Sequence, residues 1–186
     1  GQRLLALGAS EFKGLAALPL VPQELDRIGP DDNKDLFLNQ EFTLDRFLEK
    51  AGESTYNQLH VATHAEFKPG GPNASQLHSG IGPISMGELA KLRKERQGVP
   101  LDLVVFSACR TALGDANAEL GFSGLALQAG ARSAVGTLWY VDDVVTSAYF
   151  VQMYRYLDQG SPKAEAMQLT RQAFARTLVR LDGDRL

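Results

Sequence analysis

Short apolar runs alternate with amphipathic stretches along the chain. The runs at 4–7, 58–63 and 101–106 end at glycine or polar residues, which is typical of short buried strands. Residues 101–106 are almost uninterruptedly apolar, so we expect a central strand that is buried on both faces. Two further runs predict strands at 36–38 and 133–138.

Amphipathic stretches between the runs predict helices. Thr43 is a suitable N-cap for a helix through Lys50, and Ser85 and Glu88 have capping-box spacing for a helix through about Lys94. Further helices are expected at 23–28 after Pro22, at 121–129, at 143–157, and at 162–178 with Ser161 as N-cap. Because strands and helices alternate, the sequence predicts an α/β fold with a mostly parallel sheet and helices on both faces.

Two surface features are also expected. Residues 68–83 are rich in glycine and proline and predict a long loop, either a lid or binding edge or a disordered insertion. We expect His78, inside this loop, to be solvated. The basic residues Arg93, Lys94 and Arg96 are typical of a solvated helix face.

Composition and charge narrow the function classes. The 186 residues suffice for one well-buried domain, expected to span 1–186. A formal net charge of −3 argues against a nucleic-acid binder, and no apolar stretch approaches the ~18 residues of a membrane span. The single cysteine excludes a disulfide framework and fits a cytoplasmic protein. The start at Gly1-Gln2-Arg3, without methionine or signal peptide, suggests part of a longer protein.

Candidate chemistry gathers where the predicted strands end. His64 ends the run at 58–63, Cys109 follows the run at 101–106, and Trp139 follows the run at 133–138. Ligand sites of parallel sheets lie at the carboxyl ends of the strands, and a lone cysteine with a histidine fits a nucleophile and its base. The alternative is that Cys109 is a small buried hydrophobe.

Thiol chemistry also requires groups that stabilise an oxyanion. The backbone amides of Ala65 and of Cys109 itself could donate to it. His60 precedes His64 by four residues, and we expect it to be a core or wall histidine rather than half of a metal pair. A nucleotide- or flavin-binding domain is disfavoured, because Gly70-Gly71 lacks the lysine and the strand–helix setting of a phosphate loop.

Several motifs occur together in a particular order: Leu59–His64, Leu103–Thr111, Gly124–Ser133 and Leu138–Asp143, then Ser161-Pro162-Lys163-Ala164. This arrangement closely resembles the CHAT domain family, whose members are relatives of caspases and separases. The resemblance implies a caspase-like three-layer α/β sandwich and a cysteine endopeptidase that acts on a protein or peptide without a cofactor or metal. It further implies Cys109 as nucleophile and His64 as general base and acid. CHAT domains commonly follow tetratricopeptide or other repeats in bacterial proteins, which implies an attached N-terminal repeat domain.

The segment Leu138–Asp143 is similar to one in separases, in which the final acid helps to receive a basic side chain. This similarity implies that Asp143, with Trp139, binds substrate and favours Lys or Arg before the scissile bond. Alternatively, Asp142 or Asp143 only caps the following helix. Ala65 departs from the glycine usual in the family and would be strained if φ were positive. A weakly active or inactive interaction module is therefore the alternative function.

Overall fold

The computed structural model describes residues 2–29, 32–66, 74–107, 134–136, 143–163, 165–166 and 168–170. Five of the strands form one sheet in the order β2-β1-β3-β7-β8, and every neighbouring pair is parallel. The strands are β1 (Leu4–Gly8), β2 (Lys34–Leu38), β3 (Gln58–Ala62), β7 (Leu103–Ser107) and β8 (Ala134–Gly136). The prediction of a mostly parallel sheet is confirmed.

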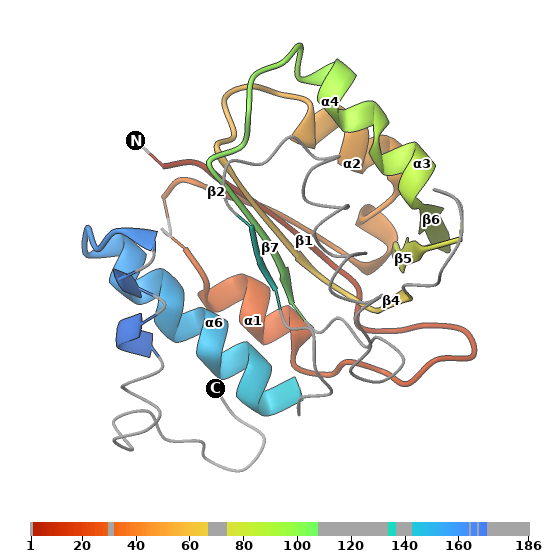
Figure 1. Cartoon of the computed structure of the whole chain (residues 1–186). Helices are drawn as coiled ribbons and strands as arrows, with labels where there is room; N and C mark the ends of the chain where they lie inside the picture. The colour runs from red at the N-terminus through yellow and green to blue at the C-terminus, as the bar shows by residue number, and fades with distance from the viewer. Residues whose placement is uncertain are drawn as a thin grey trace.

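Helices cover both faces of this sheet, so the molecule has three layers (Figure 1). One face carries α2 (Leu44–Ala51), α3 (Met86–Leu89) and α4 (Lys91–Glu95), and the other carries α1 (Val21–Arg27) and α6 (Asp143–Asp158). A short 3-10 helix, η1 (Asn39–Glu41), follows β2. The predicted helix at 143–157 is confirmed by α6, and the predicted three-layer α/β fold by the whole arrangement.

The strands bury side chains on both faces, which gives the domain two apolar cores. In β7, Val104 and Phe106 pack into the core under α2, α3 and α4, whereas Leu103 and Val105 pack into the core under α1 and α6. Full burial of one such side chain stabilises the fold by about 1.5–3 kcal/mol. The almost continuous apolar run at 101–106 is explained by this two-sided burial.

The predicted N-caps Thr43 and Ser85 are confirmed, whereas the helix expected at 23–28 begins earlier, at Val21, and one predicted helix is divided. The Thr43 hydroxyl accepts a hydrogen bond from the Arg46 amide at 3.0 Å, and the Ser85 hydroxyl accepts one from the Glu88 amide at 3.4 Å. The helix expected from Ser85 to Lys94 is two shorter ones, α3 and α4, on either side of Ala90. Ala90 keeps right-handed helical angles (φ −61°, ψ −23°), so the interruption is slight.

The expectation of an unstructured loop at 68–83 was wrong for part of its length. Antiparallel strands β4 (Ala65–Glu66), β5 (Gln76–His78) and β6 (Pro83–Ser85) form a second sheet. Leu77 and Ile84 anchor it, since both are buried in the core under α2, α3 and α4. A Cβ at Gly80 would lie 1.5 Å from the Asn39 carbonyl oxygen, so this turn requires glycine for its close approach to η1.

Arg96 also departs from its predicted exposure, for it is 2% exposed. Its guanidinium donates to five backbone carbonyl oxygens, those of Ala51, Glu53, Tyr56, Val99 and Pro100. Arg93 and Lys94 are exposed as expected. The predicted helix at 121–129 lies outside the described residues, and within 162–178 residues 163, 165–166 and 168–170 are described and helical.

Candidate active site

The sheet brings the two segments of the predicted dyad to one edge. Strands β3 and β7 are parallel neighbours, and their last residues, Ala62 and Ser107, are register partners. The Thr63 amide continues the ladder to the Ser107 carbonyl oxygen at 3.4 Å. His64 follows Ala62 by two residues, as Cys109 follows Ser107. Cys109 itself lies outside the described residues.

His64 is fixed by its backbone and by its ring. The side chain is buried, with only 4% of the residue exposed, and Nε2 lies 2.7 Å from the carbonyl oxygen of Ala16. The Phe12 ring packs against the imidazole at a centroid distance of 4.7 Å. Since a carbonyl oxygen can only accept, Nε2 carries the hydrogen, and Nδ1 is the basic nitrogen of the neutral ring.

The second sheet holds the backbone around His64. The His78 amide donates to the His64 carbonyl oxygen at 2.9 Å, and the Thr63 hydroxyl donates to the His78 carbonyl oxygen at 2.6 Å. The His78 side chain is only 15% exposed and lies 3.8 Å from a Glu66 carboxylate oxygen, so the expectation that it is solvated was wrong. The His78 side chain is covered because β5 packs beside the end of β3 and because the Phe12 ring packs against the rings of both His64 and His78.

Ala65 occupies a strand rather than a strained turn. It is the register partner of Leu77 in the antiparallel β4–β5 pair. Bonded and non-bonded pairs alternate in such ladders, and the preceding pair, His64 and His78, is bonded. The Ala65 amide is therefore directed away from β5. In the described residues, positive φ outside glycine occurs at Asn39 and Gln97, so replacement of the family's glycine causes no backbone strain at Ala65.

The other candidate residues are described only in part. Trp139 lies outside the described residues. Asp143 begins α6, consistent with a place at the start of a helix, but its side chain is not among those the structure describes. Ala16 and Phe12, which hold His64, were not predicted. No motif marks a backbone carbonyl as a partner, and Phe12 is separated from His64 by 52 positions in the sequence.

Comparison with models of protein families gives a match over nearly the whole chain. Residues 1–180 match the model of the CHAT domain. The chain belongs to the CHAT family. A search of the curated proteins gave no match to the chain.

His60 of this CHAT domain is a buried core histidine, as predicted. Its ring is 0% exposed, with Nε2 2.7 Å from Glu24 Oε2 and Nδ1 3.1 Å from the Tyr154 hydroxyl. Burial and the nearby Glu24 raise the pKa of Tyr154 well above its ordinary value, so the phenol stays protonated. No group of three or more His, Cys, Asp or Glu side chains suited to a metal occurs within the part of the chain that is described.

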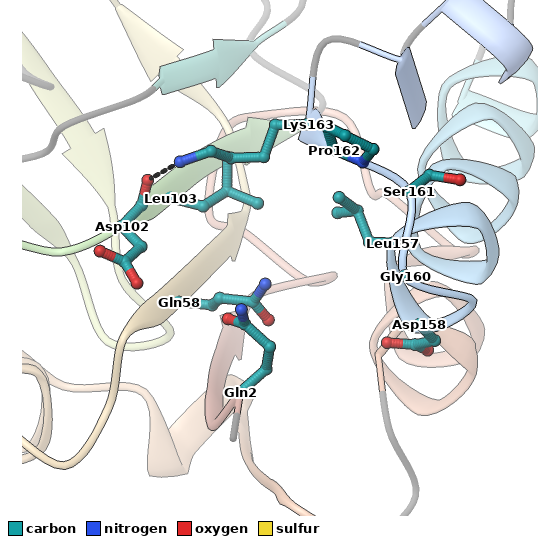
Figure 2. A pocket seen from close by; sticks show the side chains of 10 residues that line it. All are labelled: Gln2, Gln58, Asp102, Leu103, Leu157, Asp158, Gly160, Ser161, Pro162 and Lys163. Carbon is teal, nitrogen blue, oxygen red and sulfur yellow. Dashed lines mark hydrogen bonds between the residues drawn. The ribbon is translucent and has the colours of Figure 1, made fainter.

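A separate cavity of about 430 Å³ opens at the other end of the strands (Figure 2). Gln58 and Leu103, the first residues of β3 and β7, line it together with the end of α6. The Lys163 ammonium closes one side by donating to the Asp102 carbonyl oxygen at 2.8 Å. Among the described candidate residues of the CHAT active site, neither His64 nor Ala65 lines this cavity. Within the described ranges, no helix is long and apolar enough to cross a membrane.

Proposed function

We propose that this CHAT domain is a cysteine endopeptidase in which Cys109 is the nucleophile and His64 is the general base and acid. The observation that carries the proposal is the state of His64. Its Nε2–H is committed to the Ala16 carbonyl oxygen, so Nδ1 is the basic nitrogen at the end of β3. The neighbouring strand β7 ends two residues before Cys109.

The reaction follows from these roles. His64 Nδ1 removes the thiol proton as the Cys109 sulfur attacks the peptide carbonyl carbon. The Ala65 and Cys109 amides donate to the developing oxyanion, and the direction of the Ala65 amide away from β5 supports this role. Collapse of the intermediate breaks the C–N bond, and His64 returns its proton to the leaving amine. Water, deprotonated by His64, then hydrolyses the thioester and regenerates the thiol.

Alkylation provides a direct test, because the chain contains one cysteine and every thiol modification reports on Cys109. The rate of carboxamidomethylation against pH gives the apparent thiol pKa. In the unmodified protein we expect it well below the ordinary value of about 8.5. In His64→Ala we expect it near that value, with peptide hydrolysis reduced roughly 10²- to 10⁴-fold.

His78→Gln is the matched control, since it removes a second imidazole near Phe12 without removing the backbone bond to His64. We expect this variant to keep the thiol pKa of the unmodified protein. A thiol pKa that is ordinary from the start, and unchanged in His64→Ala, would refute the endopeptidase and favour an interaction module.

We further propose that Asp143, at the start of α6, favours a Lys or Arg side chain before the scissile bond. Asp143→Ala should lower kcat/KM for peptides with Lys or Arg at that position by at least about tenfold, with little effect on neutral peptides, because a charge pair is lost. Asp142→Ala serves as the control for local charge. An equal loss on basic and neutral peptides would instead assign Asp143 to capping the helix.

A further inference from the structure

A buried polar network lies beneath the candidate active site. Glu24 Oε2 is 2.7 Å from His60 Nε2 and 2.6 Å from the Ser107 hydroxyl oxygen, and all three side chains are fully buried. The Tyr154 hydroxyl extends the network to His60 Nδ1 at 3.1 Å. Four elements are thereby joined: α1, β3, β7 and α6 (Figure 1).

The hydrogen bonds converge on the Glu24 carboxylate, whose oxygens accept. His60 Nε2 donates to Glu24 Oε2, and His60 Nδ1 lies against the Tyr154 hydroxyl. The Ser107 hydroxyl donates to the same carboxylate oxygen. This one oxygen therefore accepts from both strands that lead to the candidate dyad.

Burial of a carboxylate is costly, and apolar residues of similar volume commonly fill such a space with better stability. Here the second carboxylate oxygen, Glu24 Oε1, is buried with no hydrogen-bond partner in the described structure. Stability alone therefore gives a poor account of Glu24. The location of Glu24 explains its presence better. The carboxylate binds Ser107, which is the last residue of β7 and the register partner of Ala62.

We propose that Glu24 and Ser107 are positioning residues that fix the end of β7 against β3, and thereby the distance between Cys109 and His64. This inference rests on the proposed peptidase function. His60 anchors Glu24 from β3, two residues before the strand ends, and Ser107 anchors it from β7, two residues before Cys109. Neither Glu24 nor Ser107 is assigned contact with substrate.

Ser107→Ala is the central test, because it removes a single oxygen atom from a fully buried site. We expect a folded protein whose alkylation rate at neutral pH and kcat both fall roughly 10- to 100-fold, since small displacements of reacting groups cost rates of that order. KM should change little, and the apparent thiol pKa should rise. Glu24→Leu should have the same effects, whereas Glu24→Gln, which keeps an oxygen acceptor, should restore much of the rate.

Tyr154→Phe is the matched control. It removes one buried hydroxyl at the opposite end of the network without removing the Ser107–Glu24 bond to β7 or the His60–Glu24 bond to β3. We expect it to lower the melting temperature while it leaves the alkylation rate and kcat unchanged. A folded Ser107→Ala protein with unchanged rates and thiol pKa would overturn the inference, as would equal rate losses in Tyr154→Phe.

Comparison of His64→Ala with the Ser107 and Glu24 variants distinguishes failure of the peptidase function from failure of the positioning role. If its thiol reactivity does not depend on His64, the peptidase function fails, and the positioning role fails with it. If reactivity depends on His64 but not on Ser107 or Glu24, only the positioning role fails.

Discussion

At the residue scale, Arg96 shows how a charged side chain can act as internal structure. Arg96 is the C-cap residue of α4. Its guanidinium binds carbonyl oxygens from the end of α2 and the turn after it, and from the segment before β7. Burial lowers its pKa from the ordinary value, yet arginine remains protonated throughout the physiological range. The planar group with five N–H donors matches this ring of acceptors, which an ammonium group could satisfy only in part.

Arg96→Lys should therefore destabilise the domain although it conserves charge. We expect a loss of about 2–4 kcal/mol in the free energy of unfolding, because several buried carbonyl oxygens lose their donors. Urea denaturation measures the change. Arg93→Lys, on the exposed face of the same helix, is the control and should be within about 0.5 kcal/mol of the unmodified protein. Equal stability of the two variants would contradict this role of Arg96.

At the element scale, strand β2 lies at an edge of the sheet and is fastened by polar contacts. Asp35 in β2 accepts from Arg3 at 2.9 Å and from the buried Tyr56 hydroxyl. Arg3 also lies over the Tyr56 ring at 4.3 Å. The hydrogen bond from Tyr56, followed by the bond and charge of Arg3, lowers the pKa of the Asp35 carboxyl, and burial opposes this only in part.

The sign of the resulting pH dependence is fixed. Because folding lowers the pKa of Asp35, its carboxylate stabilises the fold at pH values above the pKa of the unfolded state, about 3.9. This stabilisation is lost as the pH falls through the lower pKa of the folded state. Tyr56→Phe should reduce this stabilisation by Asp35. The difference in the free energy of unfolding between the unmodified protein and Tyr56→Phe should therefore shrink on acidification. Because the Asp35 side chain is 43% exposed, we expect the pH-dependent part of this difference to be less than about 1 kcal/mol.

Urea unfolding of both proteins at neutral and acidic pH measures this difference. Asp35→Asn, in which the titrating group is absent, is the control and should make the effect of Tyr56→Phe nearly independent of pH. A difference that grows on acidification would contradict the assignment.

At the scale of the whole molecule, local patterns predicted the layers but not the contacts between distant segments. The runs ending at His64 and before Cys109 predicted two strands with candidate residues at their carboxyl ends, because burial makes such runs recognisable. That these two strands are neighbours is a result of the structure. The small β4-β5-β6 sheet was missed, since residues 68–83 are rich in glycine and proline and its large apolar core residues are few, Leu77 and Ile84.

The surroundings of the site depended on tertiary structure and could not be read from the sequence. Glu24 is an ordinary polar residue of a short helix until α1 packs against the sheet and places it between His60 and Ser107. The expectation that His60 is a core or wall histidine was correct, but no local pattern pointed to Tyr154, which is 94 positions away. Arg96 and His78 were mispredicted for the same reason, because each is covered by residues distant in the chain.

The bond that sets the His64 tautomer has a consequence for how the sequence can change. Its acceptor belongs to the main chain of Ala16, whose own side chain is exposed. Substituting that side chain leaves the oxygen in place, so evolution or engineering can alter the chemistry presented at position 16 while the imidazole keeps its proton on the same nitrogen. Only a displacement of the backbone between β1 and α1 would remove this acceptor from the imidazole. The backbone path of that connection, rather than its amino-acid composition, is therefore the property under constraint.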